Sequence, residues 1–147
     1  MKLIGPLSIK KVIFVDRTNQ NIATLEQEGA TWLVRSMKPI TTGANRPPYQ
    51  QPTPPGIYFI QRKLSEMLFL KDGSDEEGGF APYASRFTGG AYLHGVPVNY
   101  PDNKLIEYSW TLGTTPRSHM CVRNATSHAK FMYDWAEVEK TLVIVFD

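Results

Sequence analysis

The chain has 147 residues, of which 41% are hydrophobic and 20% are charged, proportions that are ordinary for a soluble globular protein. This length suits one hydrophobic core, so we expect residues 1–147 to form a single domain. Sixteen Lys and Arg residues against fourteen Asp and Glu residues give a net charge of +2, which is too weak to indicate a nucleic-acid partner.

The start of the chain does not read as a targeting segment. Lys2, Lys10 and Lys11 are basic, but the continuous apolar region and the small-residue cleavage site of a signal peptide are missing. No apolar run approaches the roughly 20 residues that a membrane-spanning helix needs. We therefore expect a cytosolic protein, a mature form or a domain cut from a longer chain, with any membrane association made through a segment absent from this sequence.

The first half of the chain is rich in β-branched and aromatic residues, which favour strands. Gly29 separates two such runs and predicts a hairpin turn. Residues 43–56 contain five prolines and cannot form a central strand, because proline donates no ladder hydrogen bond. The strands expected in this half cover residues 11–16, 21–29, 30–37, 57–63 and 67–72.

The second half contains one expected helix among short strands. Residues 73–90 are polar and contain several glycines, so we expect a long loop that either caps a groove or is a simple solvated acidic loop. Thr126 is a suitable N-cap for a helix over residues 126–138. The remaining strands are expected at residues 91–96, 106–112 and 141–146. Together these elements predict a mostly-β fold, a sandwich or partial barrel with one late α-helix.

The stretch TTPRSHMCVRN, residues 114–124, holds the only cysteine of the chain, Cys121, so an internal disulfide bond is excluded. His119 lies two positions before it and Arg123 two positions after it. A nearby imidazole can accept the proton of a thiol, and cationic neighbours stabilise the thiolate. Composition alone leaves two interpretations open, a nucleophile and a small buried inert residue. Three histidines and one cysteine also raise the question of zinc, but their spacing matches no compact site.

Five stretches in order resemble the L,D-transpeptidase catalytic domain, also called the YkuD domain, which acts on bacterial peptidoglycan. They are VDRTNQNIATLEQEGATWLVRSMKPITTG, PTPPGIYFI, FAPYASRFTGGAYLHG, SHMCVRN and the closing helix with TLVIVF, and together they cover nearly the whole chain. The resemblance implies that Cys121 is the nucleophile and that His94 is the general base, oriented by the backbone carbonyl of Gly95. His119 and Ser118 would line the site, and the backbone N–H groups from His119 to Cys121 would form an oxyanion hole.

The reaction implied by the resemblance is acyl transfer on a peptidoglycan stem tetrapeptide. Cys121 would release the terminal D-alanine and form a thioester, and an amine of a second stem would then give a 3→3 cross-link. Neither metal nor ATP is needed, because the thioester conserves the energy of the cleaved amide. Water as acceptor would make the protein an L,D-carboxypeptidase, and a catalytically silent wall-binding module is the third hypothesis. The resemblance also implies a monomer that works outside the cytoplasmic membrane, in the cell wall or periplasm.

Two departures from the family pattern bear on the site. Met120 replaces the glycine that usually precedes the nucleophile, and 23 residues separate His94 from Ser118, more than is usual. Because Met tolerates positive φ poorly, we expect negative φ at Met120, with its side chain narrowing or covering the entrance to the thiol. Two interpretations of Arg123 remain, a ligand for a substrate carboxylate and a brace for the loop.

Two further charged residues near the motif are assigned no chemistry. Arg117 is expected to be a solvated loop charge, and His128 is expected on the surface in the first turn of the helix.

Overall fold

The computed structural model describes residues 8–147 as a mostly-β protein with one α-helix, which confirms the expected fold class. The helix is α1 (Thr126–Trp135), and a single 3₁₀ turn, η1, covers Ser109–Thr111. The strands are β1 (Lys11–Asp16), β2 (Asn21–Glu28), β3 (Thr31–Thr41), β4 (Gly56–Phe59), β5 (Arg62–Leu70), β6 (Glu77–Thr88), β7 (Ala91–His94), β8 (Val98–Asn99), β9 (Lys104–Leu105), β10 (Val122–Asn124) and β11 (Leu142–Phe146).

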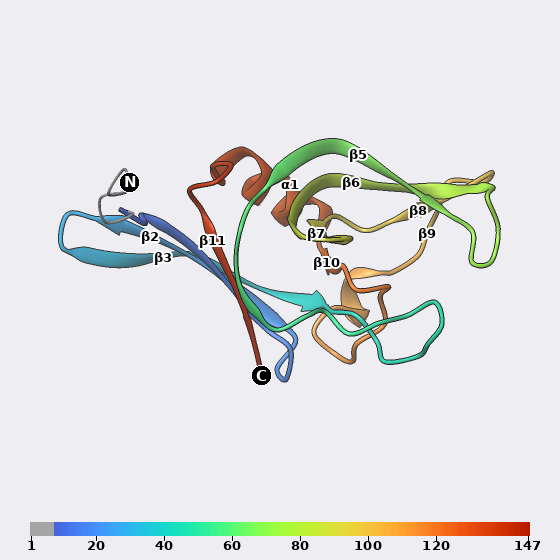
Figure 1. Ribbon diagram of the computed structural model, residues 1–147, viewed down its shortest axis with the longest axis horizontal. Coiled ribbons are helices and arrows are strands. Elements are labelled where there is room, and N and C mark those ends of the chain that lie inside the picture. The colour runs from blue at the N-terminus through green and yellow to red at the C-terminus, as the bar shows by residue number, and fades with distance from the viewer. Residues whose placement is uncertain (1–7) are drawn as a thin grey trace, which may run out of the picture.

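These strands form one open, strongly bent sheet in the order β4-β11-β1-β2-β3-β10-β7-β6-β8-β9, and β5 pairs with β6. Most neighbours are antiparallel, but β1 pairs with β11 and β7 pairs with β10 in parallel. Figure 1 shows β1, β2, β3 and β11 on one side of the molecule and the β5–β6 hairpin on the other, with α1 beside β6. The short strand β10 joins β3 of the first group to β7 of the second.

The core fills the space inside the bend of the sheet. Alternate residues of β1 and β11 point inward, as the period of two in a strand requires. From the helix, Met132 is fully buried, as is Ala129, and the chain just after α1 adds Ala136. The buried cluster also includes Ile22, Ile40, Ile60, Phe87, Leu93 and Val122, so it reaches the strands that carry the motif. Within residues 8–147, no helix is both long and apolar enough to cross a membrane.

The prediction of a loop over residues 73–90 is wrong for most of this segment. Residues 77–88 form the long strand β6, and only the connection before it and the turn after it remain irregular. Gly78, Gly79 and Pro82 lower the local strand propensity, but β6 is held by pairing with β5, β7 and β8. Tertiary pairing therefore overrides the local composition.

Two further sequence predictions require correction. Residues 106–112 do not form a strand, because the backbone N–H of Thr111 donates to the carbonyl of Tyr108 and closes the turn η1. The helix N-cap is Ala125 and not Thr126, whose hydroxyl accepts a hydrogen bond from the backbone N–H of Val96. Thr126 thus ties the start of α1 to the segment that follows β7.

Candidate active site

Residues 117–121, here called the motif loop, are fixed to the chain segment that follows β3. The backbone N–H groups of Arg117 and Ser118 both donate to the carbonyl of Thr42, and the N–H of Ala44 donates to the carbonyl of Ser118. The Ser118 hydroxyl also donates to the carbonyl of Cys121. These bonds fold the loop tightly and hold Cys121 directly before β10.

The Met120 prediction is wrong in both of its parts. Met120 has a φ of +78°, in the left-handed region that the family's glycine would occupy without strain. Its side chain packs against the hydrophobic core and does not line the cavity at the thiol. The hydroxyl of Thr53 donates to the carbonyl of Met120 and accepts from the N–H of Gly43. The surrounding hydrogen bonds therefore hold the backbone of Met120 at positive φ, and the apolar packing of its side chain offsets part of the free-energy cost of this conformation.

His94 ends β7 and is buried. Its Nδ1 lies 2.6 Å from the carbonyl oxygen of Gly95. Because a carbonyl only accepts, Nδ1 carries the proton, and Nε2 of the neutral ring is left as an acceptor. Burial lowers the pKa of His94 to about 4, the Gly95 hydrogen bond opposes this shift, and the charge of Arg123 adds to it. His94 is therefore a neutral imidazole near pH 7.

The thiol of Cys121 is buried, with 7% of the residue exposed. Sγ donates a long, weak hydrogen bond to the carbonyl of Gly90, at 3.4 Å. Burial raises the pKa of Cys121 to about 11, while the backbone N–H of Tyr92 and the charge of Arg123 lower it. In this state the residue is a protonated thiol, so a thiolate has to be generated by transfer of its proton.

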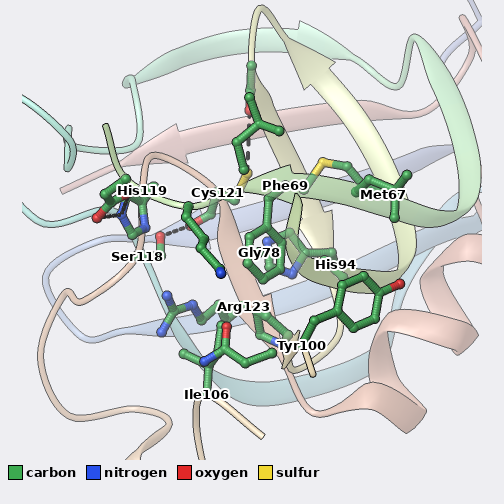
Figure 2. A pocket seen from close by; sticks show the side chains of 18 of the residues that line it. Met67, Phe69, Gly78, His94, Tyr100, Ile106, Ser118, His119, Cys121 and Arg123 are labelled. Carbon is green, nitrogen blue, oxygen red and sulfur yellow. Dashed lines mark hydrogen bonds and ion pairs between the residues drawn. The ribbon is translucent and has the colours of Figure 1, made fainter. Parts of the chain in front are cut away.

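Cys121 and His94 line the same cavity, which has a volume of about 770 Å³. His94 ends β7, and Cys121 directly precedes β10, the parallel neighbour of β7, in which Val122 pairs with Leu93 and Arg123 with His94. Figure 2 shows side chains from three sources around this cavity: Met67 and Phe69 of β5, Tyr100 and Ile106 of the chain after β7, and the residues of the motif loop. The cavity thus brings the sequence-predicted thiol and imidazole together with β5, which the sequence did not assign to the site, and with the long connection between His94 and Ser118.

Arg123 lies in the cavity wall, and its side chain is 9% exposed. Its Nη1 is 3.8 Å from Oε2 of Glu107, whose side chain is 2% exposed. Glu107 comes from residues 98–112, here called the inserted segment because they lie within the long spacing between His94 and Ser118. Sequence reasoning missed Glu107, and the only available signal was an acidic residue inside an otherwise apolar and aromatic run.

The other predicted site residues take different positions. Gly95 has no room for a side chain, since an added Cβ would lie 2.9 Å from Pro82 and 3.0 Å from the hydroxyl of Thr126. His119 lines the cavity but is exposed, and its Nε2 is 3.2 Å from the carboxylate of Asp72 in the β5–β6 hairpin. Arg117 is exposed, as predicted.

The backbone of the motif loop offers free donors. Within residues 8–147, the backbone N–H groups of His119, Met120 and Cys121 donate none of the hydrogen bonds found in the loops and turns. An oxyanion hole is built from such free N–H donors when they are directed at one oxygen position.

His128 is not on the surface but is buried behind the site. Its Nδ1 donates to Oδ1 of Asn124, and its Nε2 accepts from the hydroxyl of Ser36. The amide of Asn124 in turn donates to the carbonyls of Val122 and His94. Burial lowers the pKa of His128 to about 4, and the charge of Lys38 contributes to the shift. This network links α1 and β3 to the two strands that carry Cys121 and His94.

Fold and site together define a bent β-sheet domain with a buried thiol and a neutral imidazole on neighbouring strands. The chain belongs to the family of the L,D-transpeptidase catalytic domain, YkuD, whose family model matches residues 10–145. A comparison with curated proteins found no match.

Several solved structures share the fold. An L,D-transpeptidase from Mycobacterium smegmatis is 19% identical, with a TM-score of 0.69, and the match covers 95% of this chain and 59% of that one. An L,D-transpeptidase from Stackebrandtia nassauensis is 24% identical, with a TM-score of 0.66 and coverage of 95% and 57%. L,D-transpeptidase 3 from Mycobacterium tuberculosis, in complex with a faropenem-derived adduct, is 20% identical, with a TM-score of 0.68 and coverage of 95% and 61%. The chain therefore spans about six tenths of the length of these structures.

Proposed function

We propose that this chain is the catalytic domain of an L,D-transpeptidase that forms 3→3 peptidoglycan cross-links through a thioester on Cys121. The observation that carries the proposal is the pairing of β7 with β10, which brings His94 and Cys121 to one cavity. The hydrogen bond from Nδ1 of His94 to Gly95 leaves Nε2 as the base. A thiol and an oriented imidazole are the two groups that cysteine-dependent acyl transfer needs.

In the first half-reaction, the thiol proton passes to Nε2 of His94, and Sγ attacks the carbonyl carbon of the third stem residue. The carbonyl oxygen becomes an oxyanion, which the free N–H groups of His119, Met120 and Cys121 stabilise. Each such donor is typically worth about 3–4 kcal/mol of the barrier. The C–N bond then breaks, the imidazolium returns its proton to the leaving amine, and D-alanine departs from the thioester.

In the second half-reaction, the side-chain amine of an acceptor stem attacks the thioester carbonyl. His94 takes a proton from this amine, the C–S bond breaks, and the proton returns to the Cys121 sulfur. The two half-reactions consume one amide and produce one amide, so the chain's own residues supply all the proton transfers. With pKa values of about 4 for His94 and about 11 for Cys121, the imidazole and the thiol are both neutral near pH 7 before the proton transfer.

The cavity suits an anionic peptide. Its volume of about 770 Å³ falls within the range of roughly 300–1,000 Å³ that is usual for ligand sites. Lys71, Lys104 and Arg123 line it, of which Lys71 also pairs with Glu76 and Arg123 faces Glu107. Asp72, the only lining carboxylate among the described residues, pairs with His119. A stem tetrapeptide carries carboxylates that these cations would attract. Because this substrate is part of the cell wall, we propose that the protein works outside the cytoplasmic membrane. We also propose that it acts as a monomer.

The burial of Cys121 is the observation that favours the alternative, a catalytically silent wall-binding module. Alkylation by iodoacetamide does not separate the two hypotheses, because a thiol with a pKa of about 11 reacts slowly in either case. The probe has to be an acyl donor that fills the cavity. A carbapenem is such a donor, and a related faropenem-derived adduct is present in the M. tuberculosis structure.

The decisive experiment is mass spectrometry of the protein after incubation with a stem tetrapeptide. We expect a mass increase equal to the tripeptide acyl group in the wild type and none in Cys121→Ala, with both proteins folded by circular dichroism. Addition of an acceptor stem should give a cross-linked dimer, whereas a tripeptide as the only product would identify a carboxypeptidase. A folded wild-type protein that forms no adduct with tetrapeptide or carbapenem would overturn the proposal.

A further inference from the structure

A row of three residues crosses the sheet at the cavity wall. Arg123 of β10 pairs with Thr41 of β3 on one side and with His94 of β7 on the other. Residues directly opposite one another on neighbouring strands project from the same face of a sheet. The guanidinium of Arg123 therefore belongs to the same face as the imidazole of His94.

Glu107 of the inserted segment is placed over this row. Its Oε1 accepts hydrogen bonds from the hydroxyls of Thr41, at 2.6 Å, and Thr111, at 2.9 Å. Its Oε2 faces Nη1 of Arg123 at 3.8 Å and has no hydrogen-bond partner within residues 8–147. Two threonines thus orient the carboxylate, and its remaining oxygen is directed at the arginine.

We propose that Glu107 is a positioning residue for acyl transfer, which holds the Arg123 guanidinium in the cavity wall and balances its charge beside Cys121 and His94. The inference rests on the proposed role of Cys121 as nucleophile. It gives the inserted segment a part in catalysis, since this segment supplies the counter-charge of the site.

The charges around Arg123 explain why a counter-charge is needed. Besides Glu107, the charged and titratable groups that act on it are Cys121 and Arg117 of the motif loop, and His94 faces it from β7. A positive charge here favours the thiolate but opposes the imidazolium that forms on His94 when the thiol proton is transferred. Glu107 moderates both effects, because a buried charge without a partner acts strongly on its neighbours.

The test compares Glu107→Gln with the wild type in two assays. Gln has nearly the same shape and can still accept from the two threonines, but it lacks the charge. The pH midpoint of Cys121 alkylation by iodoacetamide should move down by about one unit, so that alkylation at pH 8 is roughly tenfold faster. The effects of the lost charge on the thiolate and on the imidazolium oppose each other, but acylation by stem tetrapeptide should still be slower by about tenfold, because the Arg123 guanidinium is no longer held in the cavity wall beside the reacting groups. A purely structural role would lower the melting temperature without moving the alkylation midpoint.

Two controls separate charge from packing. Thr41→Val removes one of the two hydroxyls that orient the carboxylate but leaves its charge in place, so the alkylation midpoint should move by less than in Glu107→Gln. Glu28→Gln removes one negative charge from the exposed end of β2 and should leave both assays unchanged. An unshifted midpoint in folded Glu107→Gln, or an equal shift in Thr41→Val, would overturn the inference.

If Glu107→Gln does not fold, Glu107→Asp tests the same inference in the alkylation assay. It keeps the charge but withdraws it by one methylene, so its alkylation rate should be faster than that of the wild type by a factor below tenfold. A folded Glu107→Asp with the wild-type profile would contradict the inference. Iodoacetamide needs no peptide, so a shifted midpoint together with absent acylation in the wild type would refute the proposed function and leave only the effect of the Glu107 charge on Cys121.

Discussion

A Cβ atom on Gly43 would lie 2.8 Å from both the backbone N and the Cα of Met120, and it would also meet the carbonyl oxygen of Gln51. The backbone after β3 and the motif loop therefore touch at Gly43 without any side chain between them. Because the atoms that would be met are backbone atoms, they cannot move aside cheaply.

We expect Gly43→Ala to lower the free energy of unfolding by about 3 kcal/mol or more, since the clash forces the motif loop away from its anchor. The measurement is equilibrium denaturation in urea. Gly90→Ala is the matched control, because a Cβ there meets no atom within 4 Å. A Gly43→Ala protein as stable as Gly90→Ala would show that the contact is not tight in solution.

Substitutions at Met120 test the strained backbone. Met120→Gly removes the cost of a positive φ, typically about 1–2 kcal/mol, but also loses the apolar packing of the side chain. The two effects oppose each other, so we expect the free energy of unfolding to change by less than about 1 kcal/mol, and acylation to persist. Met120→Val should be destabilised by about 2 kcal/mol or more, because a branched Cβ is poorly tolerated at positive φ. Equal stability of the Val and Gly variants would contradict the assigned conformation.

The hydroxyl of Thr53 is the second anchor of the motif loop. Thr53→Val keeps the shape of the side chain but leaves the N–H of Gly43 and the carbonyl of Met120 without their partner. We expect a loss of about 2–3 kcal/mol in urea denaturation and a slower acylation of Cys121. Thr31→Val, at an exposed position of β3, should change neither quantity.

Stability should fall in mild acid. His94 and His128 both have a pKa of about 4 in the folded protein, below the value of about 6.5 expected in the unfolded chain. The unfolded chain thus binds more protons between these limits. The stabilisation is fully present above pH 6.5 and is lost as pH falls through the window to about 4, by up to roughly 3 kcal/mol for His94 alone.

The measurement is the free energy of unfolding between pH 7 and pH 4. Compared with the wild type, His128→Gln should show a shallower decline, because one of the two buried groups no longer titrates. A wild-type slope in His128→Gln would mean that this ring is accessible to protons in the native state.

The sequence predicted the elements whose local signals agree with their final environment. β1, the β2–β3 hairpin with its turn at Gly29, β7 and β11 were found where the sequence placed them, because branched, aromatic and glycine residues stand where each element needs them. The helix α1 was also found, but it ends at Trp135 and not at residue 138. It failed at β6, where Gly78, Gly79 and Pro82 argue against a strand that pairing with three neighbours nevertheless stabilises.

For the site, the sequence by itself determined which groups can do chemistry: one thiol, three imidazoles and the arginines near Cys121. Only the tertiary structure decided their states and partners. It put Arg123 between Thr41 and His94, buried Glu107 against it, and left His119 in solvent beside Asp72. It also gave Met120 a positive φ, whereas the preference of Met had predicted a negative one. The physical reason is that burial, cross-strand pairing and backbone contact act between residues far apart in the chain, and no local pattern encodes them.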